Sequence, residues 1–219
     1  MTTGALICIA GCLLCLQTAE AQEIFTQGGT QGIGIGAAVS LGSHVGIHAD
    51  FNWLDFNHDI FLGGNRYKDD VRLRQGGVYL DYFPLSGHGW RVTAGVRFND
   101  DSLTAVSAPN NGTYIFGGKR YPAPPGATAT ASVRYPTAMP YLGIGFGHTP
   151  ASKGFGFIAD IGVAYGEPQT SYTLSPLLSK LAGPTRSATL ISTGQQELRD
   201  KAWRFRWYPV IQIGVSYRF

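Results

Sequence analysis

The chain ends with the stretch that decides its fold, WYPVIQIGVSYRF at residues 207–219. Large apolar residues alternate there with polar or small ones, and a period of two is typical of a β-strand with two different faces. A half-buried strand of a soluble protein also alternates, but it is usually about half this length. The stretch therefore indicates a transmembrane strand with one face toward lipid. The lipid-facing positions are Ile211, Ile213, Val215, Tyr217 and Phe219.

Three other segments repeat this alternation. In each of them one face is apolar, and the opposite face carries charged, polar or small residues. Four such segments in one chain predict a sheet whose outer surface is covered by lipid. The apolar faces are Val45, Ile47, Ala49, Phe51 and Trp53, then Trp90, Val92, Ala94, Val96 and Phe98, and finally Phe155, Phe157, Ala159, Ile161, Val163 and Tyr165.

Glycines alternate with large apolar residues in two further segments, residues 32–41 and 142–147. A dinucleotide-binding loop requires the spacing G-x-G-x-x-G between a strand and a helix. Here the spacing is strictly two and no helical pattern follows. We interpret these glycines as small inward-facing residues that leave room for larger neighbours in a narrow barrel.

Short and long connections alternate between the predicted strands. This alternation is the arrangement of an outer-membrane barrel, in which short turns face the periplasm and long loops face the outside. The short connections are 42–43, 84–89 and 149–154, and the long, polar ones are 55–66, 101–128 and 167–203.

Seven strands are evident, and an even number is expected of a bacterial single-chain barrel. We therefore predict an eighth strand at residues 23–27, which turns at 28–30. The pair Gly76-Gly77 predicts a β-bulge, because the face that carries Arg72 and Arg74 before it becomes apolar after it. The seven evident strands lie near 31–41, 44–55, 67–83, 90–102, 129–147, 154–166 and 206–219.

The composition fits a single domain with a large apolar surface. The chain has 219 residues and is 44% hydrophobic, but only 14% of the residues are charged, roughly half of the usual share for a soluble domain. After the first residues no stretch approaches the roughly 18 consecutive apolar residues of a transmembrane helix. The net charge of +3 is small and scattered, and it does not favour a nucleic-acid partner.

The N-terminal residues have the pattern of an export signal. An apolar run at residues 4–16 precedes Ala19-Glu20-Ala21, an A-x-A ending typical of signal-peptidase sites. We predict a signal peptide at 1–21 and a mature barrel domain at 22–219. All three cysteines lie in the leader, so the mature chain is expected to form no disulfide. A lipoprotein cleavage site at residues 9–12 is the alternative.

Three segments together resemble a known group of proteins: the C-terminal stretch 207–219, VYLDYFP at 78–84, and MPYLGIG at 139–145. They are similar to small proteobacterial outer-membrane barrels in the group of OmpW, the OmpA transmembrane domain and the opacity proteins. The resemblance implies an eight-stranded antiparallel transmembrane β-barrel whose last strand is read by the barrel-assembly machinery. Members of that group are narrow channels, adhesins or proteins without an assigned role, so the resemblance implies a barrel and does not choose an activity.

Alternation also predicts which polar side chains point into the barrel. They form either a charged gate or a structural ion-pair network, and we favour the network because eight strands enclose little beyond their own side chains. We expect the three arginines of this set to pair with Asp50 and Asp160 and to block the lumen. The inward set is His48, Asp50, Asn52, Arg91, Arg97, Asp160, Gln212 and Arg218, with Asp81 as a further candidate.

An enzyme that acts on lipid A is the main catalytic alternative. His58 and Asp59 near an extracellular rim, together with loop serines, provide the residue types of a base and a nucleophile. No local motif ties a serine to either of them, so we expect no enzymatic activity, no cofactor and no metal site. In the last long loop, residues 176–181 and 195–203 are expected to form short helices.

The sequence therefore predicts an exported outer-membrane β-barrel that acts as a narrow channel for small solutes or as a structural protein. A surface adhesion role of the extracellular loops is the alternative function. The expected partners are outer-membrane lipid and lipopolysaccharide, the barrel-assembly machinery, and a small solute or a ligand on a host surface.

Overall fold

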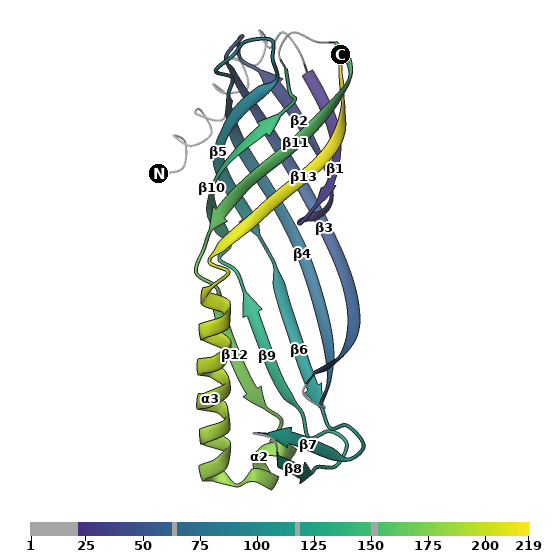
Figure 1. The fold of residues 1–219 in the computed structure, drawn as a ribbon, viewed down its shortest axis with the longest axis vertical. Helices are drawn as coiled ribbons and strands as arrows, with labels where there is room; N and C mark the ends of the chain where they lie inside the picture. Colours follow the sequence, from purple (N-terminus) through teal and green to yellow (C-terminus); the bar gives the residue numbers. More distant parts are fainter. Residues whose placement is uncertain (1–21, 63–64, 117–118, 150–152) are drawn as a thin grey trace, which may run out of the picture.

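A computed structural model describes residues 22–62, 65–116, 119–149 and 153–219. The predicted signal peptide lies outside the described residues and stays a prediction. Eight antiparallel strands close into a barrel (Figure 1). In order around the barrel they are β1 (Gln22–Gly29), β2 (Gly32–Ser40), β3 (Val45–Leu62), β4 (Asn65–Tyr82), β5 (Trp90–Asn99), β10 (Ala138–Phe146), β11 (Gly154–Tyr165) and β13 (Trp207–Arg218).

Closure depends on the first strand, β1. It pairs with β2 on one side and with the last strand, β13, on the other, with Glu23 opposite Arg218. The predicted eighth strand at 23–27 is confirmed, and it is three residues longer than expected. Both described chain ends lie at the end of the barrel with the short connections, which we call the turn end; the opposite end is the loop end (Figure 1).

The outer surface of the barrel is apolar. The predicted lipid-facing residues of β13 are between 40% and 60% exposed. Exposed aromatic residues form a girdle at each end. The span from Trp207 to Tyr217 is about 33 Å along the strand, or about 25 Å along the axis at the usual tilt, which matches a membrane core. The loop-end girdle is Trp53, Phe98, Tyr165 and Trp207, and the turn-end girdle is Tyr82, Trp90, Phe146, Phe155, Tyr217 and Phe219.

Inward glycines provide the space for large side chains, as expected. A Cβ atom on Gly36 would overlap the ring of Phe25, and one on Gly77 would overlap the ring of Tyr79. A Cβ atom on Gly145 would overlap Asp160 and Arg91. Without these glycines the polar side chains described below would not fit inside eight strands.

The predicted bulge at Gly76-Gly77 is wrong. The register of β4 is unbroken against β3, and it stays unbroken as the other partner changes from β5 to the next strand. Arg72, Arg74 and Val78 all point outward on one face. The outward face changes from apolar to charged because the strand leaves the apolar belt. The surroundings of the strand change there, while the same alternate residues continue to point outward.

The long connections are folded rather than irregular. The predicted loop 55–66 lies largely in the β3–β4 hairpin, which extends past the barrel. Beyond β4 the sheet continues through β6, β9 and β12, and we call these strands with the two helices and the β7–β8 hairpin the loop-end extension (Figure 1). Its elements are β6 (Ser102–Ala108), β7 (Thr113–Phe116), β8 (Lys119–Pro122), β9 (Ala129–Arg134), β12 (Gln169–Leu174), α2 (Pro176–Ala182) and α3 (Pro184–Trp203).

Two expectations about the extension need correction. The single strand predicted at 129–147 divides into β9 and β10, with Pro136 between them, since proline cannot donate to the ladder. The short helix predicted at 195–203 is the last part of the 20-residue helix α3. The other short helix is confirmed as α2, and the Ser175 side chain accepts a hydrogen bond from the backbone N–H of Leu178 at its start. Within the described residues, no helix is long and apolar enough to cross a membrane.

Candidate functional site

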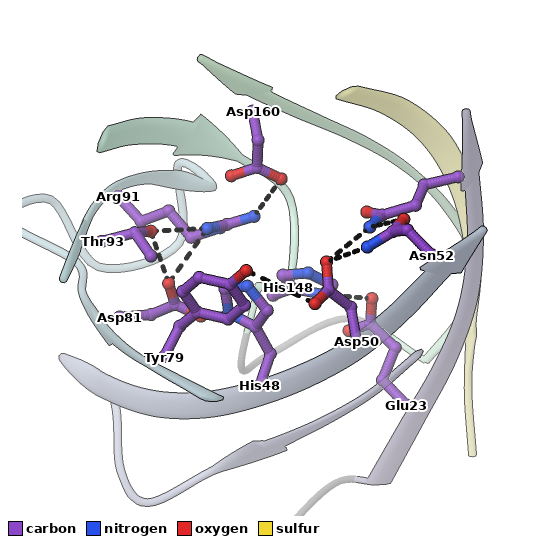
Figure 2. Close-up of polar contacts among 11 residues, drawn as sticks. Glu23, His48, Asp50, Asn52, Tyr79, Asp81, Arg91, Thr93, His148 and Asp160 are labelled. Carbon is purple, nitrogen blue, oxygen red and sulfur yellow. Dashed lines mark hydrogen bonds and ion pairs between the residues drawn. The ribbon is translucent and has the colours of Figure 1, made fainter. Parts of the chain in front are cut away.

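The candidate site is the polar interior of the barrel. All eight residues predicted to point inward lie there, and Asp81 lies there as well. Seven of the eight are at most 8% exposed, while Asp50 is partly exposed. Figure 2 shows the central part of this network, with side chains from the two halves of the barrel wall pointing toward one another.

At the turn end, Glu23 binds Arg218 and His148. Its Oε2 accepts hydrogen bonds from Arg218, at 3.0 Å from Nε, and its Oε1 lies 2.8 Å from Nδ1 of His148. Arg218 also donates to Oγ of Ser40 at 2.8 Å. His148 follows β10 with a φ of 55°, and this left-handed backbone turns its ring into the barrel, where it is 4% exposed. These side chains close the turn end.

The next layer is centred on Arg91. Its guanidinium donates to Asp81 at 3.0 Å and to Asp160 at 2.8 Å, so one arginine joins carboxylates from β4 and β11. Nδ1 of His48 lies 2.6 Å from the other oxygen of Asp81. Thr93 donates to Asp81 at 2.6 Å. Removing Arg91 would leave two buried carboxylates without their shared arginine, which is costly.

Asp50 is held by neutral groups. Its Oδ2 accepts hydrogen bonds at 2.8 Å from the side-chain amides of Gln27 and Asn52. The hydroxyl of Tyr79 lies 3.4 Å from Oδ1 (Figure 2). Among the described residues no Lys, Arg or His side chain lies within 4 Å of this carboxylate.

Arg97 dominates the loop end of the interior. It is fully buried and donates to the side-chain oxygen of Gln75, while its guanidinium carbon lies 5.7 Å from the centre of the Tyr208 ring. Gln75 donates in turn to Asp101 at 2.5 Å. Asp101 lies just beyond β5, outside the membrane-spanning strands, and burial raises its pKa to about 6.

The expected pairing is wrong in part. Arg91 does bind Asp160, but Arg218 binds Glu23, and Arg97 has no carboxylate within 4 Å among the described side chains. Asp50 binds amides instead of an arginine. Alternation decides which residues point inward, whereas their height along the axis and their neighbours depend on strand stagger, and the sequence does not reveal stagger.

Several interior residues were not among the sequence candidates. Glu23 and Gln27 lie on the same face of β1. The predicted eighth strand, together with its alternation, would have identified both as inward residues. Gln75 and Tyr79 were missed because the predicted bulge disturbed the face assignment of β4. Gln31 and His148 lie in connections, where no periodicity identifies them.

The interior is nearly filled. The rings of Tyr79 and Tyr141 meet edge to face, with centres 5.1 Å apart, and pack with Met139 and Val210 across the lumen. The cavity between these rings and the acidic side chains measures about 10 Å³, which is room for about one water molecule. Among the described residues, these side chains leave no room at this level of the barrel for a continuous column of water.

Catalytic or metal chemistry would require reactive or metal-binding side chains that converge on one site. No group of three or more His, Cys, Asp or Glu side chains converges as a metal centre within the described residues. His58 and Asp59 belong to β3 rather than to a loop, and their side chains lie outside the described part of the structure. The enzymatic alternative is therefore untested.

The fold and the filled polar interior define a small eight-stranded transmembrane β-barrel. No family model matches the chain, and no curated protein matches it. Two solved structures are similar: CarO2 and CarO of Acinetobacter baumannii, at TM-scores of 0.58 and 0.57 and identities of 18% and 16%. The matches cover 91% and 90% of this chain and 98% and 97% of those chains. At such identities the similarity establishes the fold.

A third solved structure is a major outer membrane protein from Thermus thermophilus. It has a TM-score of 0.47 and 16% identity, with 91% of this chain and 99% of that chain covered.

Proposed function

We propose that this protein resides in the outer membrane, with its turn end in the periplasm and its loop-end extension outside the cell. The apolar belt, the two aromatic girdles and the short turns support this placement. The A-x-A ending at residues 19–21 supports export through a cleavable signal peptide. An affiliation with the OmpW-like group of small barrels belongs to the same proposal.

In this proposal the barrel is a narrow channel for small solutes that is closed at rest. The carrying observation is that Arg91, Asp81 and Asp160 form a buried charged layer where apolar side chains would pack more cheaply. Charged side chains become hydrated when they separate, so a charged layer is suited to opening in a way that an apolar core is not. Small solutes would cross when these side chains move apart.

Single-channel recording of the refolded protein in planar bilayers tests this function. We expect the wild type to conduct at or near background, because the interior space between the acidic and aromatic side chains holds about one water molecule. Asp160→Ala removes one partner of Arg91, and as a gate variant it should raise the conductance. Asp55→Ala, which changes an exposed carboxylate outside the barrel, is the matched control and should conduct like the wild type.

Two outcomes contradict the channel. If Asp160→Ala lowers folding stability while the conductance stays at background, the layer is structural only and the protein serves as a membrane anchor. A wild-type conductance of general-porin size would contradict both roles, because it requires a bore that these side chains do not leave.

A second function is supported by the size of the loop-end extension. Its sheet and α3 project beyond the end of the barrel (Figure 1), and such folded loops often bind partners. In this role the barrel presents the extension to a ligand on another surface. Replacing residues 102–134 and 167–203 with short linkers should then abolish adhesion to host cells or matrix, while the barrel still inserts.

The remaining partners follow from the barrel itself. We propose that the outer face contacts membrane lipid and lipopolysaccharide, and that the barrel-assembly machinery reads the apolar face of β13. We propose no enzymatic activity, no cofactor and no nucleic-acid partner.

A further inference from the structure

A small cavity lies near the middle of the barrel interior. Its volume is about 10 Å³, close to that of a single water molecule or a single dehydrated ion. Oxygen-bearing side chains predominate around it, and two of them are carboxylates from opposite sides of the barrel. The polar lining consists of Gln27, Gln31, His48, Asp50, Tyr79, Tyr141, Asp160 and Gln212.

Asp160 has an unused oxygen at this cavity. Its Oδ2 accepts from Arg91 at 2.8 Å, but its Oδ1 is buried and has no hydrogen-bond partner in the described structure. The residue is 8% exposed. A buried acceptor without a donor carries a desolvation cost, so a ligand that interacts with this oxygen is favoured.

The charges around the cavity are not balanced. Arg91 is shared between Asp81 and Asp160, so one positive charge serves two negative ones. Among the described residues, the donors to Asp50 are all neutral. A water molecule would satisfy a hydrogen bond here but would not offset the excess negative charge. A cation would do both, because it interacts with an unused lone pair and neutralises a carboxylate.

We propose that this cavity binds one alkali cation, Na⁺ or K⁺, between Asp50 and Asp160. Carboxylate, amide and phenol oxygens are ligands of hard cations, whereas soft transition metals favour thiolate and imidazole ligands. His48 lines the same cavity, but its Nδ1 is engaged by Asp81. Of the two carboxylates that line the cavity, Asp50 is the one with no cationic side chain within 4 Å among the described residues, and the single charge of the ion would offset it. The site requires no conduction, so it stands apart from the proposed channel.

The test compares cations at constant ionic strength. Folded wild-type protein in vesicles of neutral phosphatidylcholine is unfolded with urea in NaCl, in KCl, and in the chloride of the bulky cation N-methylglucamine. We expect NaCl or KCl to stabilise the barrel. At ten times the dissociation constant, the folding equilibrium constant should rise about elevenfold. Binding of radioactive ²²Na⁺ by equilibrium dialysis should approach one ion per barrel, with K⁺ as a competitor.

Asp50→Asn is the decisive variant. Its amide oxygen can still accept from Gln27 and Asn52, and its nitrogen can donate to the hydroxyl of Tyr79, so the variant is expected to fold. It should lose both the bound ²²Na⁺ and the stabilisation by NaCl and KCl. Asp55→Asn, on the exposed outer face of the same strand, should keep both.

Equal stability of the wild type in all three salts together with no bound ²²Na⁺ would overturn the proposal and leave water as the occupant. Retention of the ion by Asp50→Asn would also overturn it, because Asp50 is the charge that calls for a cation. If the ion binds but no conductance is detected in any variant, the channel proposal fails while the cation site stands.

Discussion

Two neighbouring glycines show how narrow the interior is. Gly77 points inward beneath the ring of Tyr79, where a Cβ atom would overlap that ring. Gly76 points outward, and its nearest neighbour would be the backbone oxygen of Asp50 at 3.3 Å. The same methyl group is therefore tolerated at one position and excluded at the next.

We predict that Gly77→Ala destabilises the barrel by about 1–3 kcal/mol through overpacking. Gly76→Ala should stay within about 1 kcal/mol of the wild type, because the neighbouring carbonyl needs to shift only slightly. Unfolding by urea in lipid vesicles measures both. Equal effects of the two substitutions would show that Tyr79 is free to leave its place above Gly77.

A second residue-scale prediction concerns the lipid face. Ala94 lies midway between the girdle residues Trp90 and Phe98 of β5, and it points outward. Ala94→Arg should lower the free energy of unfolding by about 2–4 kcal/mol, the cost of a cation at the bilayer midplane. Ala94→Leu is the control and should not destabilise the barrel. A tolerated arginine would mean that the face assignment of β5 is shifted by one residue.

At the scale of elements, β13 has two separable tasks. Its outward residues face lipid, whereas Arg218 points inward to Glu23 and is 3% exposed. Faces separate in this way because neighbouring residues of a strand point in opposite directions. The last outward residue, Phe219, follows directly after the last inward one.

We predict that deletion of Phe219 impairs membrane insertion more than Arg218→Ala does. The deletion removes the end of the apolar face that the assembly machinery reads. Arg218→Ala should instead lower the stability of barrels that have inserted, because Glu23 loses a charge partner. The amount of heat-modifiable, folded protein in outer-membrane fractions measures insertion. Equal accumulation of the deletion variant and the wild type would contradict this assignment.

At the scale of the whole molecule, the barrel and the loop-end extension differ in how their sheets end. The barrel has no free edge, because β1 pairs with β13. The pairing of β3 with β2 ends at Trp53. Beyond that residue β3 continues into the extension, where β4 is its partner among the described strands. The loop-end extension has a small apolar cluster of its own around Ala127, Ala129 and Leu178, which is its main packed core among the described residues.

This difference predicts unequal protection from hydrogen exchange. Amide protons of β11 and β13 should exchange slowest, since closure and lipid shield them. Amide protons of β6, β9 and β12 should exchange much faster, because their opening exposes little apolar surface. Mass spectrometry of the protein in vesicles measures both sets. Equal protection would show that the extension unfolds only together with the barrel.

The sequence by itself determined the barrel and the face of nearly every membrane strand. This was possible because lipid outside and polar side chains inside impose a period of two that each strand carries alone. Only the tertiary structure decided the partners inside. Closure joins Glu23 to Arg218 from opposite ends of the chain, and strand stagger leaves Asp50 among amides. Past the membrane, lipid no longer imposes the alternation, so the loop-end extension and the length of α3 emerged only from packing.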